Sequence, residues 1–267
     1  SAPVNFWTKE NLDKALSKHT YTNDNPIAGL FPTQSGVYAY VIRDGLYKTQ
    51  HSKPDWMALP TPQGVYQVND IKEDEAGNIY LACQDGIYFS SDGGQTWERR
   101  FKIGWALQVE IQNNTIIASG KGGLYSSDDS GTTWKKLPIR QDMAFQYIRD
   151  DNVSYKLMRF GKGLAALRSE TPANKGLPGK LQISMDGGKT WQIPLADDSL
   201  KNLEGITTVF FDEGKIYCSF KTGIICSEDN GRIWKTLLRS EITETNTALL
   251  LHLSGGILYC TEAMLGC

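Results

Sequence analysis

The eight residues SSDGGQTW, at positions 90–97, have the composition of a small ligand site. They include a carboxylate (Asp92), three hydroxyls, two glycines and an indole. Ligand sites combine a few polar groups with aromatic side chains in this way. The first question is therefore whether these residues bind a ligand or hold the fold together.

The stretch recurs, which favours a structural role. Its copies are SDDSGTTW at 127–134, SMDGGKTW at 184–191 and SEDNGRIW at 227–234. The first three occurrences keep the pattern Ser-x-Asp-x-Gly-x-Thr-Trp, and the last has Ile233 in place of the threonine. A degenerate copy, TQHSKPDW at 49–56, retains only the tryptophan of the pattern.

This pattern resembles the Asp-box (BNR) repeat family, which includes sialidases, sortilin-type receptors, some glycoside hydrolases and a photosystem assembly factor. The resemblance implies a β-propeller and leaves the activity open, because the family is functionally mixed. In such a repeat the Asp accepts backbone N–H bonds, the Gly takes a conformation that other residues avoid, and the Trp packs between blades. We therefore expect structural roles for the four box carboxylates, Asp92, Asp129, Asp186 and Asp229.

Short β-rich runs surround each box and predict the elements that position it. NIYLACQDGIYFS (78–90), TIIASGKGGLYS (115–126) and KIYCSFKTGIICS (215–227) each read as two strands joined by a Gly-ended tight turn. Another apolar run precedes each pair, and the box tryptophan opens a fourth run. Four strands that recur about every 40 residues are typical of a propeller blade.

The spacing of the tryptophans predicts an all-β fold. We expect a six-bladed β-propeller of four-stranded antiparallel blades, forming a single domain over residues 1–267. The last blade would take three strands from residues 246–267 and its outer strand from the N-terminal residues around 4–10. Pairing of the two termini would cover strand edges that an open ring leaves unpaired. The segment TKENLDKALSKH after Trp7 predicts a short helix.

The composition excludes several classes of protein. Of the 267 residues, 40% are hydrophobic and 22% are charged, and the formal net charge is -2. These values indicate neither disorder nor a general affinity for nucleic acid, and no apolar run reaches the roughly 18–20 residues that span a bilayer. The start Ser1-Ala2-Pro3 fits a processed chain or a cloning remnant. The family resemblance favours a secreted or periplasmic location, and we expect a monomer without a cofactor.

A candidate binding face follows from the predicted topology. Turns between the second and third strands share a face with the loops between blades, opposite the boxes, and propeller sites usually lie there. The tight turns RDG, QDG, KGG, GKG and KTG would place four cations on this face: Arg43, Lys121, Lys162 and Lys221. A positive rim could attract an acidic glycan, a carboxylate or an acidic protein surface. The alternative is a set of ordinary solvated turn residues.

Two more groups of residues fall on the same face. The fourth blade is overlong and carries a basic stretch, residues 159–180, whose cations include Arg159, Lys162 and Arg168. It is either a functional loop or a decorative insertion. The mouths of the inner strands hold Tyr66, Trp105, Arg140 and Glu204. Trp105 would either stack on a sugar face or be buried by its neighbours.

The five cysteines and three histidines indicate no metal centre. Cys218 and Cys226 fall on paired strands of one hairpin, and Cys260 and Cys267 are their counterparts in the next. They serve as small hydrophobic residues or form disulfides. No CxxC spacing is present, and the histidines show no ligand spacing.

The resemblance to sialidases implies a catalytic Arg in a Phe/Tyr-Arg-Ile-Pro motif. The sequence lacks this motif, since Arg43 stands in the turn VIRDG, and it also lacks nucleophile motifs, P-loops and dinucleotide fingerprints. The sequence therefore predicts a non-catalytic propeller that binds a protein partner or an acidic ligand through a basic funnel face. The alternative is a divergent glycoside hydrolase or other glycan-active enzyme that uses Tyr66 and funnel carboxylates, namely Asp44, Asp85, Asp142 or Glu204.

Overall fold

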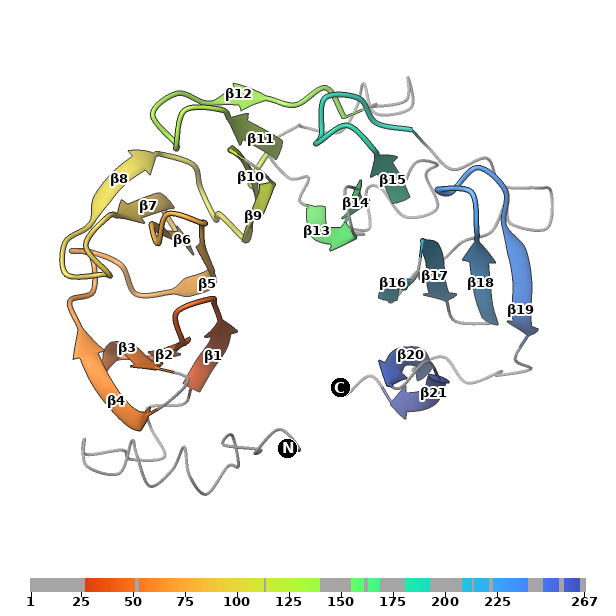
Figure 1. The fold of residues 1–267 in the computed structure, drawn as a ribbon, viewed down its shortest axis with the longest axis horizontal. Coiled ribbons are helices and arrows are strands. Elements are labelled where there is room, and N and C mark those ends of the chain that lie inside the picture. The colour runs from red at the N-terminus through yellow and green to blue at the C-terminus, as the bar shows by residue number, and fades with distance from the viewer. Residues whose placement is uncertain are drawn as a thin grey trace. The chain divides into compact units, whose positions relative to one another are not determined.

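The structure is a computed structural model in which the chain divides into two compact units, Ser1–Lys136 and Leu137–Cys267. It describes residues 27–50, 53–112, 114–139, 155–160, 163–168, 181–192, 208–212, 214–220, 223–239, 247–254 and 257–264. These residues form antiparallel strands and no helix, so the prediction of an all-β chain is confirmed for them (Figure 1). The helix expected after Trp7 and the strand expected around residues 4–10 lie outside the described residues.

The first unit holds three four-stranded sheets. Their strands, sheet by sheet, are β1 (Ile27–Pro32), β2 (Val37–Val41), β3 (Gly45–Gln50) and β4 (Lys53–Leu59); β5 (Val68–Glu73), β6 (Ile79–Cys83), β7 (Gly86–Ser90) and β8 (Glu98–Phe101); and β9 (Gln108–Gln112), β10 (Thr115–Gly120), β11 (Gly123–Ser127) and β12 (Lys135–Lys136). In each sheet the strands pair in chain order, as a blade requires.

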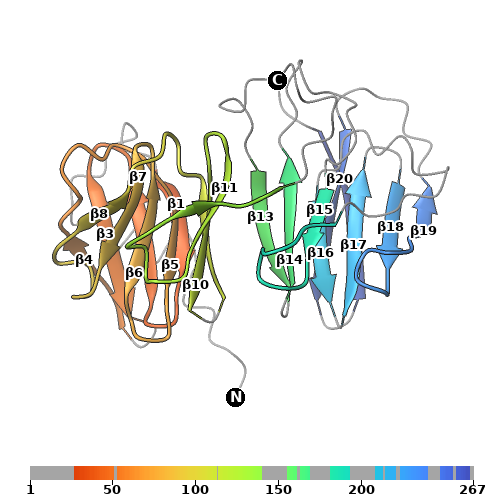
Figure 2. The same ribbon diagram turned by 90° about the horizontal axis from the view of Figure 1, so that it is seen from above.

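The second unit holds a three-stranded, a four-stranded and a two-stranded sheet among its described residues (Figure 2). Their strands are β13 (Tyr155–Phe160), β14 (Gly163–Arg168) and β15 (Leu181–Ser184); β16 (Thr208–Asp212), β17 (Lys215–Phe220), β18 (Gly223–Ser227) and β19 (Lys235–Arg239); and β20 (Thr247–Ser254) and β21 (Ile257–Met264). The predicted hairpins 78–90, 115–126 and 215–227 are all confirmed.

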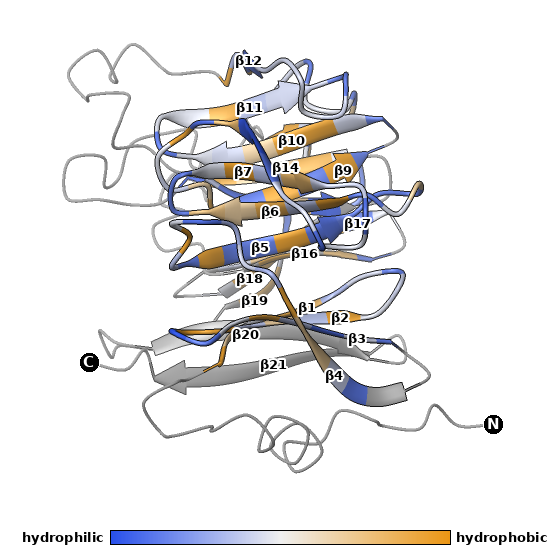
Figure 3. Cartoon of the chain, turned by 90° about the vertical axis from the view of Figure 1, so that its left-hand side faces the viewer, coloured by the Kyte–Doolittle hydropathy of each residue, from blue (hydrophilic) through white to orange (hydrophobic). Residues whose placement is uncertain are grey.

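The cores of the first unit lie between neighbouring sheets. Tyr38 and Tyr40 of β2 pack with Ile71 and Leu81 of the second sheet. On the opposite face of that second sheet, Tyr80 packs against residues of the third sheet such as Val109 and Ile116. Figure 3 shows hydrophobic segments on β5, β6, β9 and β10, the strands that supply much of this core. Because strand side chains alternate between faces, each central strand is apolar on both sides.

Each Asp-box is a closed set of local hydrogen bonds in the turn between the third and fourth strands. In the first box, Asp92 accepts the backbone N–H of Thr96 at 2.9 Å and its hydroxyl at 2.6 Å. The Ser90 hydroxyl donates to Asp92 and accepts the backbone N–H of Gly94 at 2.9 Å. The same bonds recur at Asp129, so the box is structural, as predicted. Asp186 and Asp229 also hold their boxes together.

The hydrogen bonds hold these carboxylates in the ionised form. Donation by the Thr133 hydroxyl and backbone lowers the pKa of Asp129 to about 2. Donation by Thr96 lowers the pKa of Asp92 further. Two consecutive left-handed residues let the turn close around the carboxylate: Ser130 (φ 57°) and Gly131 (φ 86°) in the second box. The first of these two positions is Gly, Ser, Gly and Asn in the four boxes.

The box tryptophan joins its sheet to the preceding one within the first unit. Trp97 donates its indole N–H to the carbonyl of Pro60, which follows the fourth strand of the first sheet, at 2.8 Å. The Trp134 ring stacks on Phe101 of β8, with centroids 4.6 Å apart. The fourth strand begins at the residue after the tryptophan in β8, β12 and β19.

The fourth box, with Ile233 in place of Thr, has lost one bond. The Ile233 backbone N–H still donates to Asp229 at 2.8 Å, but the hydroxyl bond of the other boxes is missing and the Ile233 side chain is exposed. Ile233→Thr is expected to raise the unfolding temperature, because it restores a hydroxyl donor to Asp229 and removes an exposed apolar side chain. Ile233→Val is the control, since valine has the shape of threonine without the hydroxyl. Equal unfolding temperatures for the two variants, by calorimetry, would contradict the prediction.

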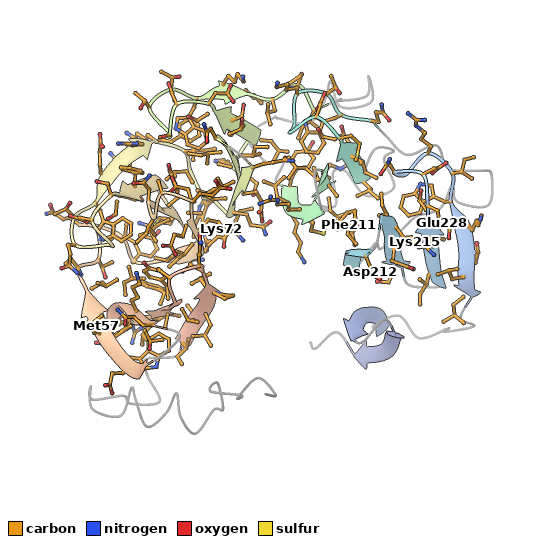
Figure 4. All side chains as sticks on the ribbon, viewed as in Figure 1. Met57, Lys72, Phe211, Asp212, Lys215 and Glu228 are labelled. Carbon is orange, nitrogen blue, oxygen red and sulfur yellow. The ribbon has the colours of Figure 1, made fainter. Side chains whose placement is uncertain are left out.

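Beside the fourth box, Glu228 accepts ion pairs from Lys215 at 3.1 Å and Lys235 at 3.3 Å (Figure 4). The second box has the same arrangement, with Lys135 on Asp128. All these groups are exposed, so the pairs contribute little to stability.

The cysteines of β17 and β18 lie on opposite faces of the sheet. Cys218 stands opposite Ile225, and Cys226 stands opposite Tyr217. Cys83, Cys218 and Cys226 are buried free thiols, so the small-hydrophobic interpretation holds for them. Cys260 lies in β21, whose side chains are not described, and Cys267 lies outside the described residues.

Two predicted details differ from the structure. The turn GKG (161–163) joins β13 to β14, and β15 leads directly into the box at Ser184, so Lys162 lies between the first and second strands and not between the second and third. The prediction placed Lys162 wrongly because the connection between the second and third strands, β14 and β15, is the long insertion of residues 169–180. At the C-terminus, where three strands are predicted from residues 246–267, the described residues form two, and β21 runs unbroken from Ile257 to Met264. No Gly interrupts that stretch.

Candidate binding surface at the loop end of the first unit

One end of the first unit gathers the turns between second and third strands and the connections between sheets. We call it the loop end, and it comprises residues 42–44, 60–67, 84–85, 102–107 and 121–122. Three hydrogen bonds tie these segments together: Leu46 N–H to Thr61 Oγ1 (3.2 Å), Trp105 N–H to the Gln84 carbonyl (2.8 Å), and Lys121 N–H to the Gly104 carbonyl (2.9 Å). The boxes lie at the other end of the same strands, so the predicted separation of the two ends is confirmed within this unit.

Buried amide side chains hold the loop end in place. Gln84 donates its Nε2–H to the Gly64 carbonyl at 2.9 Å and accepts the Gln67 backbone N–H at 3.2 Å. Gln67 donates to the Asn69 side chain, which donates to the Ala106 carbonyl, both at 2.7 Å. Gln84 is therefore a buried connector, although its turn position predicted a rim residue.

Two cations of the predicted rim stand on this surface. Arg43 and Lys121 are both exposed. Among the described residues neither side chain has an ion-pair or hydrogen-bond partner. The Lys121 side chain runs alongside Gly104, where its Cδ would lie 3.5 Å from a Cβ at that position. Within the part of the chain that the structure describes, each of these cations is thus left to pair with an anion at the loop end.

Two large aromatic side chains are exposed beside these cations. Tyr66 is 63% exposed and Trp105 is 46% exposed. In the four described boxes the indole N–H donates to a carbonyl, whereas the described part of the chain offers no acceptor to the Trp105 indole. The sequence left Trp105 either exposed for stacking on a sugar or buried by its neighbours, and the structure shows it exposed. Its ring and its N–H are both available to a ligand.

Trp105 also has a strained backbone. Its φ is 50°, in the left-handed region that bulky residues avoid. Gly64 stands at the equivalent place in the preceding connection, three residues before a Gln-Val pair, and has φ 81°. The fold therefore accepts glycine here. The Trp105 backbone is held in place by its own N–H bond to the Gln84 carbonyl and by the bond from the next N–H, that of Ala106, to the Cys83 carbonyl. Strain of this kind often marks a functional residue. Arg43 shares the feature, with φ 66°.

Trp105→Gly is expected to unfold less readily than Trp105→Ala. Both variants remove the ring, but alanine keeps the left-handed strain, which costs about 1–2 kcal/mol, and glycine relieves it. Urea unfolding of the two variants measures the difference. If alanine were equal to glycine, the backbone at Trp105 would not be strained.

The carboxylates of the loop end are engaged within their own hairpins. Asp44 accepts the Tyr47 hydroxyl at 2.8 Å, and Asp85 accepts the Tyr88 hydroxyl at 2.9 Å and an ion pair from Arg99. Burial and the neighbouring carboxylate raise the pKa of each tyrosine to about 12. Both tyrosines thus remain neutral hydrogen-bond donors. The predicted catalytic candidates Asp142 and Glu204 lie outside the described residues.

The remaining predicted site residues lie in the second unit. Arg159 is exposed near the end of β13, while Arg168 is 2% exposed at the end of β14. Arg140, Lys162, Glu204 and Lys221 lie outside the described residues. Of the predicted site residues, Arg43, Tyr66, Trp105 and Lys121 thus lie on segments of the loop end of the first unit.

Sequence reasoning missed the residues that support this surface. Gln67 and Asn69 carry no motif, and their roles depend on hydrogen bonds that the repeat does not encode. The exposed Ile42 carries no motif either. The left-handed Trp105 had one available signal, its alignment with Gly64.

Within the described ranges, no three His, Cys, Asp or Glu side chains are grouped so that they could hold a metal ion. Nor does that part of the chain contain a helix with the length and hydropathy needed to cross a membrane.

Residues 88–99 match the model of the BNR/Asp-box repeat. They cover the end of β7, the first box and the start of β8, and three more turns repeat the bond from the box Gly N–H to the box Ser hydroxyl. The chain carries Asp-box repeats. No curated protein matches the chain at a significant level.

Solved Asp-box propellers share the fold. The extracellular domain assigned to a one-component system of B. thetaiotaomicron has a TM-score of 0.60 at 12% identity, over 89% of this chain and 31% of that one. A GH74 xyloglucanase from Xanthomonas campestris has a TM-score of 0.58 at 15% identity, over 84% and 40% of the two chains. This chain thus spans well under half of either protein.

YCF48 is closer in length to this chain than those two proteins are. The structure of YCF48 bound to a D1 peptide gives a TM-score of 0.54 at 13% identity, over 85% of this chain and 75% of that one. YCF48 from Cyanidioschyzon merolae gives 0.53 at 12% identity, over 91% and 94%. Likenesses at this identity show the fold, and the similar proteins include both enzymes and a peptide-binding protein.

Proposed function

We propose that this protein is a non-catalytic binding propeller that recognises an acidic ligand, on a protein partner or a glycan, through the loop end of its first unit. The proposal includes six blades, the last completed by the N-terminal strand around residues 4–10, and an extracytoplasmic location. One observation carries it: on the loop end, Arg43 and Lys121 have no side-chain partner among the described residues, and Tyr66 and Trp105 are exposed there.

The residue types support recognition of a partner. Trp, Tyr and Arg are enriched among the residues that dominate binding energy in protein interfaces. The amide network around Gln84 fixes the backbone before binding, which lowers the entropy cost of association. Unpaired cations add electrostatic attraction to an acidic partner.

The similar proteins support the same class of function by analogy. YCF48 has been solved with a bound D1 peptide, and a further relative in fold is an extracellular domain. The peptide complex supports binding through a propeller surface, and the extracellular domain supports a location outside the cytoplasm.

A glycan-active enzyme is the second candidate, because GH74 enzymes share the fold. Two of its proposed carboxylates, Asp44 and Asp85, accept hydrogen bonds from tyrosines of their own hairpins, which favours a structural role for them. Release of reducing ends from a pool of neutral and acidic glycans, followed by mass spectrometry, would establish this candidate and displace the first.

Charge reversal tests the binding proposal. Arg43→Glu with Lys121→Glu is expected to abolish retention on immobilised polyglutamate and on acidic glycans, since it replaces attraction with repulsion. Retention of the unchanged protein should weaken as salt is added. The readout is the retained fraction of the full chain at a series of salt concentrations.

The matched control reverses an Arg and a Lys at the box end of the second unit. Arg232 and Lys189 occupy the same position in two boxes, and both are exposed. Arg232→Glu with Lys189→Glu makes the same change in net charge and should leave retention unchanged. Equal losses in the two double variants would show that net charge, and not the loop end, governs binding.

A further inference from the structure

The loop end of the first unit combines its cations with apolar tips. Three of the five large hydrophobic residues exposed in the described part of this unit lie there: Ile42, Tyr66 and Trp105. Each stands on a different segment, the turn after β2, the connection before β5 and the connection before β9. The other two, Leu30 and Met57, lie within strands β1 and β4.

The box end of the same unit has the opposite character. The charged residues within its boxes 90–97 and 127–134 are the carboxylates Asp92, Asp128 and Asp129, and exposed hydroxyls such as Thr96 and Thr133 lie beside them. None of the exposed large hydrophobic residues described for this unit lies in the boxes 90–97 and 127–134. The strands between the two ends are only five or six residues long in β6, β7, β10 and β11. The strands thus separate an anionic, polar end from an end with apolar tips. At this second end Asp44 and Asp85 accept tyrosine hydroxyls, while Arg43 and Lys121 have no side-chain partner among the described residues.

Such a combination matches the layers of a bilayer surface. Tyr and Trp favour the membrane–water interface, where the ring meets hydrocarbon and the polar group meets water. Lys and Arg are attracted to anionic headgroups. The free Trp105 indole N–H would find a phosphate or carbonyl acceptor at the same depth.

From this we infer that the loop end docks on the surface of an anionic phospholipid bilayer. Ile42, Tyr66 and Trp105 enter the interface, and Arg43 and Lys121 contact the headgroups. This inference rests on the proposed function for the identity of the binding surface, and it goes beyond it by adding anionic lipid to the acidic ligands that the surface would bind. The acidic box end faces away from the membrane, because it would be repelled by anionic lipid.

The surface needs little reorganisation to dock in this way. The backbone N–H groups of Trp105 and Ala106 are bonded to the carbonyls of Gln84 and Cys83. Gln84 in turn holds the connection that carries Tyr66, through the Gly64 carbonyl and the Gln67 N–H. The aromatic residues are therefore presented by a fixed scaffold, which preserves the gain from burying them.

The test is flotation of the full chain with phosphatidylcholine vesicles, with and without phosphatidylglycerol. We expect flotation only with phosphatidylglycerol, and release by high salt. Trp105→Gly should lower the partition coefficient by about tenfold, through lost burial of the ring. Arg43→Gln and Lys121→Gln should each lower it by about fivefold. Glycine is chosen at position 105 because the left-handed backbone accepts it, so the variant keeps its fold.

Met57→Ala and Lys189→Gln are the matched controls, because they remove an exposed apolar group and an exposed cation outside the loop end. Both should float like the unchanged protein. Quenching of Trp105 fluorescence by brominated lipid, absent in Trp105→Gly, would place the ring at the interface.

Failure of this inference is distinguishable from failure of the proposed function. If polyglutamate is retained through Arg43 and Lys121 but vesicles do not float the protein, the membrane inference is wrong and the acidic ligand is soluble. If vesicles bind equally in Trp105→Gly, Arg43→Gln and the controls, adsorption does not use the loop end and the inference is again wrong. If neither polyglutamate nor vesicles bind, both proposals fail.

Discussion

Gly86→Ala is expected to destabilise the second sheet of the first unit by about 2–5 kcal/mol, from left-handed strain together with overpacking. Gly86 ends the tight turn between β6 and β7 and has φ 151°. A Cβ there would lie 2.0 Å from the backbone carbonyl oxygen of Phe101 in β8. Backbone cannot swing aside as a side chain can, so the sheet must separate β8 from β7 or distort the turn.

Gly123→Ala provides the control for this prediction. Gly123 has the same place in the next sheet and a similar φ of 135°, but its Cβ would meet only the flexible end of Lys136, at 3.3 Å. This variant should therefore show the strain alone, about 1–2 kcal/mol. Urea unfolding of both variants gives the comparison, and equal losses would mean that the approach of β8 to Gly86 has no energetic consequence.

The second large effect concerns the pH dependence contributed by Asp70. This carboxylate is buried on β5, where it accepts the backbone N–H of Ile71 at 2.9 Å and that of Val109, in the next sheet, at 3.0 Å. It thus bridges two sheets. Burial raises its pKa from 3.8 to about 6, with Lys72 opposing the rise and Glu110 adding to it.

A raised carboxyl pKa fixes the sign of the effect. Between pH 3.8 and about 6 the folded state binds more protons at Asp70 than the unfolded state does. The stabilisation from Asp70 is therefore complete below the lower value and is lost as pH rises through the upper one. Its size is about 3 kcal/mol.

Asp70→Asn removes this titration. The difference in unfolding free energy between the unchanged protein and Asp70→Asn should thus fall by about 3 kcal/mol on going from acid to neutral pH. The comparison must be a difference, because box carboxylates such as Asp92 and Asp129 have lowered pKa values and act in the opposite direction. A difference that does not change with pH would contradict the raised pKa of Asp70.

Much of the local structure could be predicted because the repeat encodes it. The Ser-x-Asp-x-Gly-x-Thr-Trp pattern specified turns in which the Asp and Ser side chains bond only within eight residues, and it located β7, β8, β11 and β12 correctly. The error at GKG shows the limit of the method. A Gly-ended turn marks a hairpin, but it does not say which hairpin of the sheet it joins when another connection is long.

The candidate surface at the loop end was less accessible to sequence reasoning. The positions of Arg43, Lys121, Tyr66 and Trp105 at the ends of strands were predicted from the repeat, because the ends of strands are predictable once the strands are. Asp70 and Gln84 were not, since each acts by reaching a backbone group of another segment. Contacts of that kind depend on how sheets pack, and no pattern within one repeat records them.

The bonds of each Asp-box have a consequence for folding order and for evolution. Because Asp92 meets only groups within four residues of itself, the turn needs no distant partner and has a very low contact order. It can close early and bring its two strands into register before the sheets meet. The same independence lets a repeat be duplicated as a unit and then diverge at its other end, where the loops that carry function vary freely.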